Sequence, residues 1–199
     1  MLGLLAVIIA YLLGSIPVGY LLVKFSTGED IRESGSGNIG ATNVLRTQGR
    51  GRGILTLVLD ILKGLLAVFI ADKLSGGSDL WMSAAAIAVM AGHAYPVFLQ
   101  FHGGKAVASF IGAFLYLTPG PLLAVVIVFV VVVAVTHYIS AGSIIAAGLF
   151  PFGVWMILHP NWPVLLAAFL AGGFIVIRHK SNLERIRSGT ENVFRWSRN

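Results

Sequence analysis

The chain has no cysteine among its 199 residues, and only 11% of them are charged. Without cysteine there is no disulfide framework, no thiol nucleophile and no metal site built on thiolates. At 57% hydrophobic residues, the chain has more apolar surface than a water-soluble core of this size could bury. The first five residues also lack the basic stretch of a secretory signal, so we expect them to belong to a first span. These shortages indicate an all-α membrane protein whose solvent is the bilayer.

Acidic residues are scarce as well, since 8 Asp and Glu stand against 14 Lys and Arg, for a net charge of +6. A basic chain can bind nucleic acid. Here, however, the basic residues lie in the gaps between apolar runs, which is typical of the positive-inside rule and of an anionic lipid or substrate. We therefore expect membrane lipid, and no nucleic acid, among the partners.

Seven apolar segments predict a bundle of seven transmembrane helices, some of them short, that forms a single domain over residues 1–199. The segments cover roughly residues 3–23, 53–73, 80–100, 106–118, 121–137, 142–158 and 162–177. A span needs about 20 residues. The short segment 106–118 is therefore open to three interpretations: a half-helix, a re-entrant piece, or a span through a thinned part of the bilayer.

The basic residues predict the orientation of the bundle. The gaps 24–52 and 101–105 and the tail after residue 177 hold five, one and six of them, together 12 of the 14. With seven spans, all three regions lie on the same side. The positive-inside rule then places the N-terminus outside and the C-terminus in the cytoplasm.

The most polar stretch of the chain is the loop at residues 34–52, which follows the first span. Its glycines let the backbone approach a ligand closely and point N–H groups at an anion, and an arginine can grip a phosphate with two hydrogen bonds. The candidate ligands share hydrogen-bond donors; they are Ser36, Gly37, Asn38, Gly40, Thr42, Asn43 and Arg46. The alternative is a flexible cytoplasmic linker that carries basic topology signals.

A second polar stretch runs from His93 to Ser109 and contains Gly103, Gly104 and Lys105. If a helix begins at residue 106, the two glycines lie at its N-terminus, where an anion binds readily and Lys105 adds a point charge. The alternative is a turn with a lysine that sets topology. His93 lies inside or near the end of a span, so it is either functional or a hydrogen-bonded structural histidine.

The third stretch follows the last apolar segment. His179, Asn182 and Arg185 recur at steps of three, so a helix would place them near one face. The alternative is a basic tail that rests on anionic lipid. Ser143, which opens the sixth apolar segment, is a further candidate ligand or else a helix cap.

Within the second span, Asp60 and Lys63 lie three residues apart. This spacing on a helix predicts an ion pair, which lowers the cost of holding both charges in the membrane.

The predicted topology places all three polar stretches on the cytoplasmic face, where they could line one pocket for an anionic head group with an apolar tail. The scattered histidines and few acids offer no metal-ligand spacing, and there is no Gly-x-Ser-x-Gly nucleophile elbow. We therefore expect no metal and no covalent serine enzyme. The rival class is a small transporter for an organic phosphate, but internal repeats and polar residues at mid-membrane on several spans are missing.

Read together, the three stretches resemble the motifs of the bacterial acyl-phosphate glycerol-3-phosphate acyltransferases of the PlsY type. The first motif is residues 36–43 with Arg46, the second runs from Gly92 to Lys105, and the third comprises His179, Asn182, Arg185, Gly189 and Glu191. The resemblance extends over nearly the whole chain. One departure is that the family has glycine and threonine where this chain has Ala106 and Ser109.

The resemblance implies transfer of a fatty acyl group from acyl phosphate to the 1-hydroxyl of glycerol 3-phosphate, which yields lysophosphatidic acid and inorganic phosphate. This is the first committed step of phospholipid biosynthesis. The resemblance further implies a multi-pass protein of the bacterial inner membrane, with the active site on the cytoplasmic face. No cofactor is expected, and we expect a monomer.

The resemblance also implies that the second motif binds glycerol 3-phosphate and that the first and third carry catalysis. From the chemistry of an acyl phosphate, we expect Arg46 and Lys105 to hold phosphate, and Ser36, Asn38 and Asn182 to position or polarise the reactants. Two groups could accept the proton of the attacking hydroxyl: His179, or a phosphate oxygen of the donor.

Overall fold

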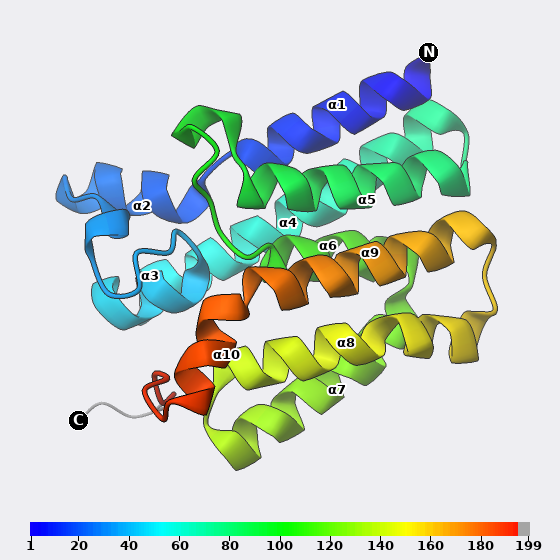
Figure 1. The fold of residues 1–199 in the computed structure, drawn as a ribbon. Helices are drawn as coiled ribbons and strands as arrows, with labels where there is room; N and C mark the ends of the chain where they lie inside the picture. The colour runs from blue at the N-terminus through cyan, green and yellow to red at the C-terminus, as the bar shows by residue number, and fades with distance from the viewer. Residues whose placement is uncertain (195–199) are drawn as a thin grey trace. The chain divides into compact units, whose positions relative to one another are not determined.

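The computed structural model describes residues 1–194, and every regular element in that range is a helix (Figure 1). The chain divides into two compact units, Met1–Leu117 and Thr118–Asn199. The first unit holds α1 (Leu2–Ser15), α2 (Val18–Thr27), η1 (Ile31–Glu33), α3 (Ala41–Gln48), α4 (Arg50–Ser75), α5 (Asp79–Ala94), η2 (Val97–Leu99) and α6 (Val107–Leu117). The second holds α7 (Pro119–Thr136), α8 (Ile139–Leu158), α9 (Trp162–Arg178) and α10 (Lys180–Arg187).

The all-α prediction is therefore confirmed, and every predicted apolar segment is mostly helical, although the segment 3–23 is divided between α1 and α2. Five stretches of the described chain are long and apolar enough to cross a bilayer, and α9 with α10 would add a sixth across a bend of 52°. Helix α6 has 11 residues, about 16 Å at 1.5 Å per residue, which is half the usual hydrocarbon thickness. Thus the chain is a multi-pass membrane protein, while the count of seven spans and their orientation stay predictions.

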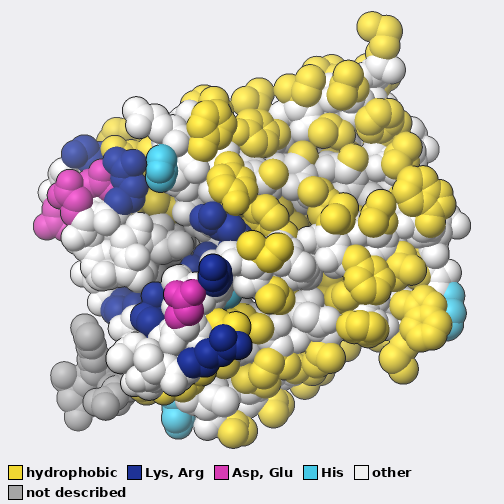
Figure 2. Space-filling model, in the orientation of Figure 1, with side chains coloured by type: hydrophobic (Ala, Val, Ile, Leu, Met, Phe, Trp, Pro, Cys, Tyr) yellow, Lys and Arg dark blue, Asp and Glu magenta, His cyan; other side chains and the backbone are white. Residues whose placement is uncertain are grey.

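Large hydrophobic side chains cover much of the visible surface (Figure 2). Val135 of α7 is 76% exposed, and Met156 of α8 and Trp162 of α9 are 67% and 66% exposed. Exposure on this scale would be costly in water, at about 25 cal/mol for each square ångström of apolar surface. It is what a chain with lipid as its solvent requires.

Glycines set the close approach of the helices in the first unit. At Gly14 of α1 and Gly92 of α5, an added Cβ would overlap a backbone carbonyl oxygen of the facing helix. Gly64 of α4 and Gly112 of α6 meet the facing backbone in the same way. In lipid the hydrophobic effect does not drive helices together, so they associate through van der Waals packing. Small residues such as these glycines strengthen it by letting the two backbones come into contact.

A proline breaks the first apolar segment into α1 and α2, and a buried lysine satisfies the backbone there. Pro17 has no N–H to donate, so the helix cannot continue through it. The Nζ of Lys63 donates to the carbonyl oxygens of Gly14 and Ile16, at 2.9 Å each. It also lies 2.8 Å from Oδ1 of Asp60, which confirms the predicted ion pair. Lys63 thus supplies the donors that backbone carbonyls need away from water.

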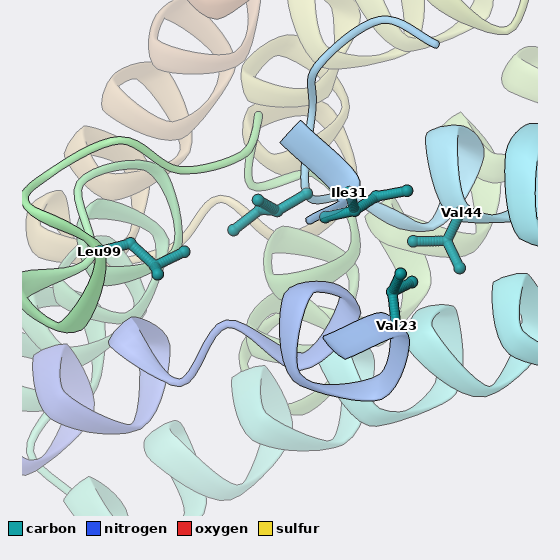
Figure 3. Close-up of a cluster of buried hydrophobic side chains, with 5 residues drawn as sticks. Val23, Ile31, Val44 and Leu99 are labelled. Carbon is teal, nitrogen blue, oxygen red and sulfur yellow. The ribbon is translucent and has the colours of Figure 1, made fainter. Parts of the chain in front are cut away.

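A small apolar cluster ties the first polar loop to the start of the second (Figure 3). Val23 of α2 and Val44 of α3 contribute to it, together with Ile31 of η1, Ile39 and Leu99 of η2. Ile39 belongs to the first motif, and Leu99 lies between His93 and the glycines of the second. The two motifs therefore share one core in the first unit.

In the second unit, α7 packs on α8 and α8 on α9. Gly172 lets α9 approach α8, because a Cβ there would lie 2.5 Å from the carbonyl oxygen of Ala147. Two sharp reversals join the three helices, with His137 at φ 60° after α7 and His159 at φ 45° after α8. The third motif begins with His179, directly after α9.

Candidate active site

The first motif is a loop held together by one buried amide. Asn43 is 2% exposed, and its Oδ1 accepts the N–H of Ser36 at 2.9 Å. Its Nδ2 donates to the carbonyl oxygens of Ser34 and Asn38, at 3.0 and 2.9 Å, and more distantly to that of Ile31 at 3.4 Å. The side chain thus closes the loop at both ends. These hydrogen bonds engage both polar atoms of the amide. The predicted role of Asn43 in substrate binding stays a prediction.

The candidate ligands of this loop differ in exposure. Ser36, Gly37 and Thr42 are exposed, while Asn38 and Arg46 are half-buried. Gly37 has φ 69°, a left-handed conformation that glycine adopts without strain. The Oδ1 of Asn38 accepts the N–H of Gly40 at 2.8 Å, directly before α3. The loop can therefore present hydroxyl and amide groups on a fixed backbone.

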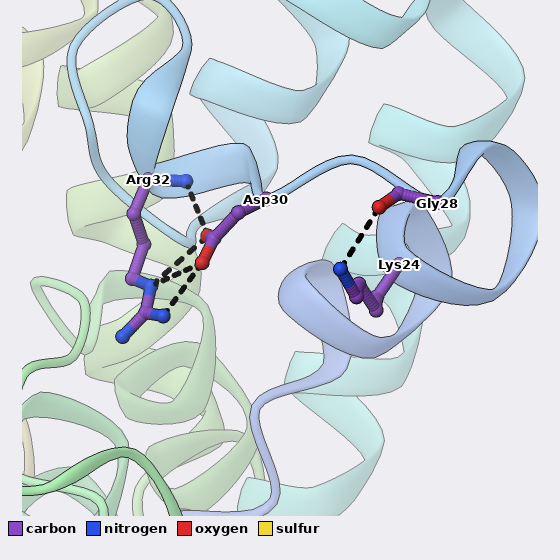
Figure 4. Close-up of polar contacts among 4 residues, drawn as sticks. All are labelled: Lys24, Gly28, Asp30 and Arg32. Atoms are coloured by element: carbon purple, nitrogen blue, oxygen red, sulfur yellow. Dashed lines mark hydrogen bonds and ion pairs between the residues drawn. The ribbon is translucent and has the colours of Figure 1, made fainter.

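An ion pair beside the loop fixes its approach from α2 (Figure 4). Arg32 donates from Nε and Nη2 to the carboxylate of Asp30, with a shortest distance of 2.6 Å. These hydrogen bonds hold the pKa of Asp30 below its ordinary value, and the same carboxylate raises the pKa of Arg32. Before it, Lys24 donates to the carbonyl oxygen of Gly28 at 2.9 Å and closes the end of α2.

The second motif folds its glycines onto His93. The N–H of Gly104 donates to the carbonyl oxygen of His93 at 3.0 Å. A Cβ on Gly104 would overlap the imidazole Nε2, and one on Gly103 would overlap the His93 carbonyl oxygen. Both positions therefore need glycine for close contact rather than for backbone freedom. His93 itself is 4% exposed, and its predicted role as a substrate ligand stays a prediction.

Lys105 is half-buried and stands two residues before α6 begins at Val107, so the glycines do precede a helix N-terminus as predicted. Between them, Ala106 has φ 61° and is fully buried. At this position, where the resemblance implied glycine, the backbone has the left-handed conformation that glycine adopts without strain. Ala106 therefore places backbone strain directly before α6.

A buried carboxylate lies behind this motif. Oδ1 of Asp60, on α4, is 3.5 Å from Nδ1 of His93, on α5. Asp60 and Lys63 are 1% and 7% exposed. Sequence reasoning found the Asp60–Lys63 pair from its spacing, but it missed the contact with His93, since nothing in the order of residues indicates it.

The third motif converges on Glu191. Its Oε1 accepts from Oγ of Ser140 at 3.0 Å and from Nδ2 of Asn182 at 2.8 Å. Its Oε2 accepts from Nε of Arg185 at 2.8 Å. Asn182 and Arg185 do share a face of α10, as their spacing predicted. Glu191 was part of the motif but had no predicted role, and the structure gives it the role of joining α8, α10 and the segment after α10.

His179 stands at the bend between α9 and α10 and is 3% exposed. Its Nδ1 lies 2.8 Å from the carbonyl oxygen of Ile175. A carbonyl can only accept, so Nδ1 carries the proton, and in the neutral ring Nε2 is the acceptor. This fixed tautomer is what a general base needs.

The prediction for Ser143 was wrong in its placement. Helix α8 begins at Ile139, so Ser143 lies within the second turn and neither opens nor caps the helix. Its Oγ donates to the carbonyl oxygen of Ile139 at 3.0 Å, and the residue is 5% exposed. The predicted start at 142 was late because Ile139, Ser140 and Ala141 continue the helix before the strongly apolar run. A role in ligand binding stays a prediction.

The first unit thus brings the first and second motifs together around one apolar cluster, and the second unit assembles the third motif around Glu191. The shared pocket of all three motifs, like the single domain over 1–199, stays a prediction. Among residues 1–194, no group of three or more His, Asp or Glu side chains could hold a metal ion.

Comparisons with known proteins agree with this arrangement. The family model described as glycerol-3-phosphate acyltransferase matches residues 4–189. A glycerol-3-phosphate acyltransferase of Geobacter sulfurreducens is 49% identical over 188 residues, 94% of this chain and 95% of that protein. The counterpart of Geotalea daltonii is 47% identical and covers 94% of both chains.

Two crystal structures of PlsY (YgiH), an integral membrane glycerol 3-phosphate acyltransferase, are similar to the whole chain. The glycerol 3-phosphate form has a TM-score of 0.91 and 38% identity, covering 97% of this chain and 96% of that one. The lysophosphatidic acid form has a TM-score of 0.88 and 36% identity, covering 97% and 95%. The chain belongs to the glycerol-3-phosphate acyltransferase family.

Proposed function

We propose that this protein transfers a fatty acyl group from acyl phosphate to the 1-hydroxyl of glycerol 3-phosphate. In this reaction the hydroxyl oxygen attacks the acyl carbonyl carbon, and the bond from that carbon to the phosphate oxygen breaks. The products are lysophosphatidic acid and inorganic phosphate. Relatives that are crystallised with glycerol 3-phosphate and with lysophosphatidic acid support the acceptor and the product.

The observation that carries the proposal is the glycine segment of the second motif. Gly103 and Gly104 are seated on His93, and Lys105 follows them directly before the N-terminus of α6. Backbone N–H groups at a helix start, together with an ammonium, favour a phosphate. We assign this segment to the phosphate of glycerol 3-phosphate.

An acyl phosphate is a mixed anhydride, so its leaving phosphate needs little protonation. The protein then has to neutralise two phosphates and to hold the hydroxyl near the carbonyl carbon. We assign Arg46 to phosphate neutralisation, and Ser36 and Asn38 to orientation of the donor. We assign further hydrogen-bond donors to Asn182 and Arg185, both bonded to Glu191.

The proton of the attacking hydroxyl has two routes. The first is Nε2 of His179, supported by the Nδ1 contact with the Ile175 carbonyl that fixes the tautomer. The second is an oxygen of the donor phosphate. A pH profile separates them, because a histidine base produces an acidic limb that disappears in His179→Gln. A residual rate with an unchanged profile in that variant assigns the proton to the phosphate.

The membrane setting of the proposal is the bacterial inner membrane, with seven spans, the N-terminus outside and the reaction on the cytoplasmic face. Basic residues at 24–52 and after 177 support this orientation. We propose a monomer that works without a cofactor or a nucleic-acid partner.

The test uses the full chain in detergent with palmitoyl phosphate and labelled glycerol 3-phosphate. We expect lysophosphatidate and inorganic phosphate in equal amounts, and no product from palmitoyl-CoA. Lys105→Gln should lower kcat/KM for glycerol 3-phosphate about a hundredfold. The matched control is Lys73→Gln, which changes a lysine that is 63% exposed at the far end of α4. Uptake of a phosphate ester into vesicles without acyl transfer would instead establish a transporter.

A further inference from the structure

Three buried polar side chains form a continuous series of contacts behind the second motif. Lys63 Nζ binds the two carbonyl oxygens at the break between α1 and α2, and it lies 2.8 Å from Oδ1 of Asp60. The same oxygen of Asp60 lies 3.5 Å from Nδ1 of His93. The opposite edge of that ring, around Nε2, faces Gly104. The series therefore runs from one helix break to the glycine segment.

Packing holds each member of this series in place. His93 follows Gly92, which lies against the backbone of α1, so the end of α5 has no room to shift. Asp60 lies one turn before Gly64, which lies against the backbone of α6. Asp60, Lys63 and His93 are all at most 7% exposed. The carboxylate on α4 and the ring on α5 are thus held in place by packing against α6 and α1.

The glycine segment depends on the orientation of that ring. Only hydrogen fits between the Gly104 Cα and the imidazole, so a tilt of the ring would push the segment outward. The Gly104 N–H is also bonded to the His93 carbonyl oxygen. A displacement there moves Lys105, the next residue, away from the anion it is proposed to bind.

We propose that Asp60, paired with Lys63, is a positioning residue that sets the His93 ring and through it the glycine segment that binds the acceptor phosphate. The inference rests on the proposed function, because it assigns that segment to glycerol 3-phosphate. Asp60 does not touch the substrate in this scheme. It acts through His93.

The first test compares Asp60→Asn with Asp72→Asn. Both changes remove a carboxylate of α4 that is paired with a lysine at 2.8 Å, but Asp72 belongs to the opposite end of the helix, where it also binds Tyr116. We expect Asp60→Asn to raise KM for glycerol 3-phosphate at least tenfold, because a shift of about 1 Å can cost a hundredfold. KM for acyl phosphate should stay within about twofold, and Asp72→Asn should change neither. Equal effects of the two variants would overturn the proposal.

If Asp60→Asn does not fold, the test uses Asp60→Glu instead, because this variant keeps a negative charge beside Lys63. The added methylene moves the carboxylate relative to the ring, so KM for glycerol 3-phosphate should rise at least threefold, on the order expected for a sub-ångström shift. An unchanged KM in this variant would contradict the proposed role.

The second test is a double-mutant cycle between ring and glycine. Gly104→Ala alone should raise KM for glycerol 3-phosphate strongly, since its Cβ meets the imidazole. In a His93→Ala background the ring is absent, so Gly104→Ala should raise KM for glycerol 3-phosphate by less than about twofold. Such a loss of effect is what coupled residues show in a double-mutant cycle. Additive effects would show that the ring does not set the segment.

Hydrogen exchange separates a failure of this inference from a failure of the proposed function. The Gly104 amide is hydrogen-bonded, so exchange in a peptide covering residues 101–106 reports seating without any substrate. We expect faster exchange there in Asp60→Asn and no change in Asp72→Asn. If the wild type transfers no acyl group, the proposed function fails, while the exchange result still decides the positioning role.

Discussion

Asn43→Ala should unravel the loop of the first motif. The change removes three hydrogen bonds of 2.9 to 3.0 Å, one accepted from Ser36 and two donated to Ser34 and Asn38. At about 1 kcal/mol of net stability for each, the loop loses about 3 kcal/mol. The longer contact with Ile31, at 3.4 Å, is outside the usual range of a strong bond and adds little. Acyl transfer should fall by at least a hundredfold, since Ser36 and Asn38 lose their fixed backbone.

Two further variants sharpen this test. Asn43→Asp keeps the acceptor for the Ser36 N–H but turns an oxygen toward two carbonyl oxygens, so it should destabilise at least as much as alanine. Thr47→Val removes one bond, from Thr47 Oγ1 to the Asn43 carbonyl oxygen at 2.9 Å, and should cost only about 1 kcal/mol. The order of the three variants therefore distinguishes loss of the amide from a general loosening of α3.

The measurement is equilibrium unfolding in mixed micelles, followed by tryptophan fluorescence, together with hydrogen exchange of residues 34–40. Rapid exchange across that peptide in Asn43→Ala, but not in Thr47→Val, is the expected result. The reasoning is refuted if Asn43→Ala loses less than about 1 kcal/mol and keeps the loop protected, because these three hydrogen bonds cannot then be what holds the loop.

Three other changes give distinct outcomes. Ala106→Gly should change the free energy of unfolding by less than about 1 kcal/mol, because relief of left-handed strain offsets the lost methyl and the added entropy of the unfolded chain. Ala106→Val should lower the free energy of unfolding by more than about 2 kcal/mol. Thermal unfolding of the two variants checks both values. The lowered pKa of Asp30 means that its bond with Arg32 stabilises the fold above the ordinary aspartate pKa, and this stabilisation is lost as the pH falls through the lowered pKa. After solvent screening the stabilisation is at most about 1 kcal/mol. This pH-dependent contribution should be absent when Asp30→Asn is unfolded by acid. Glu191→Gln should lose about 2 kcal/mol and slow acyl transfer, because it removes the charged acceptor of Arg185; unchanged unfolding would contradict its role in the third motif.

The helices were predictable because the bilayer leaves a long apolar segment no other structure. A backbone in lipid must satisfy its own hydrogen bonds, so each such segment becomes a helix. The break at Pro17 was not predicted, although proline disfavours a continuous helix. What allows it is Lys63, which lies 47 residues from Ile16 in sequence and satisfies the carbonyls there. A donor so distant in sequence is invisible to any local pattern.

The candidate site was predicted at the level of motifs and less well at the level of roles. The Asn182–Arg185 spacing gave the shared face of α10, because helical periodicity is local. The partner of both residues, Glu191, approaches from beyond the helix, and its bond to Ser140 spans 51 residues. The start of α8 was missed because polar residues before an apolar run look like a loop, although Ser140 is buried against Glu191.

Burial separates two kinds of polar residue that the motifs present alike. Asn43, His93 and Glu191 are 2%, 4% and 9% exposed, and their bonds or contacts are with other parts of their own unit. Ser36 and Thr42 are exposed on the first loop. A buried polar group away from water must find a partner within the protein, so selection for folding fixes its identity as strictly as selection for chemistry does. Substitution of a residue of the first kind should therefore lower the free energy of unfolding and the protection from hydrogen exchange before it lowers activity. Substitution of a residue of the second kind should lower kcat/KM alone. Unfolding and kinetics measured on the same variants decide the assignment residue by residue.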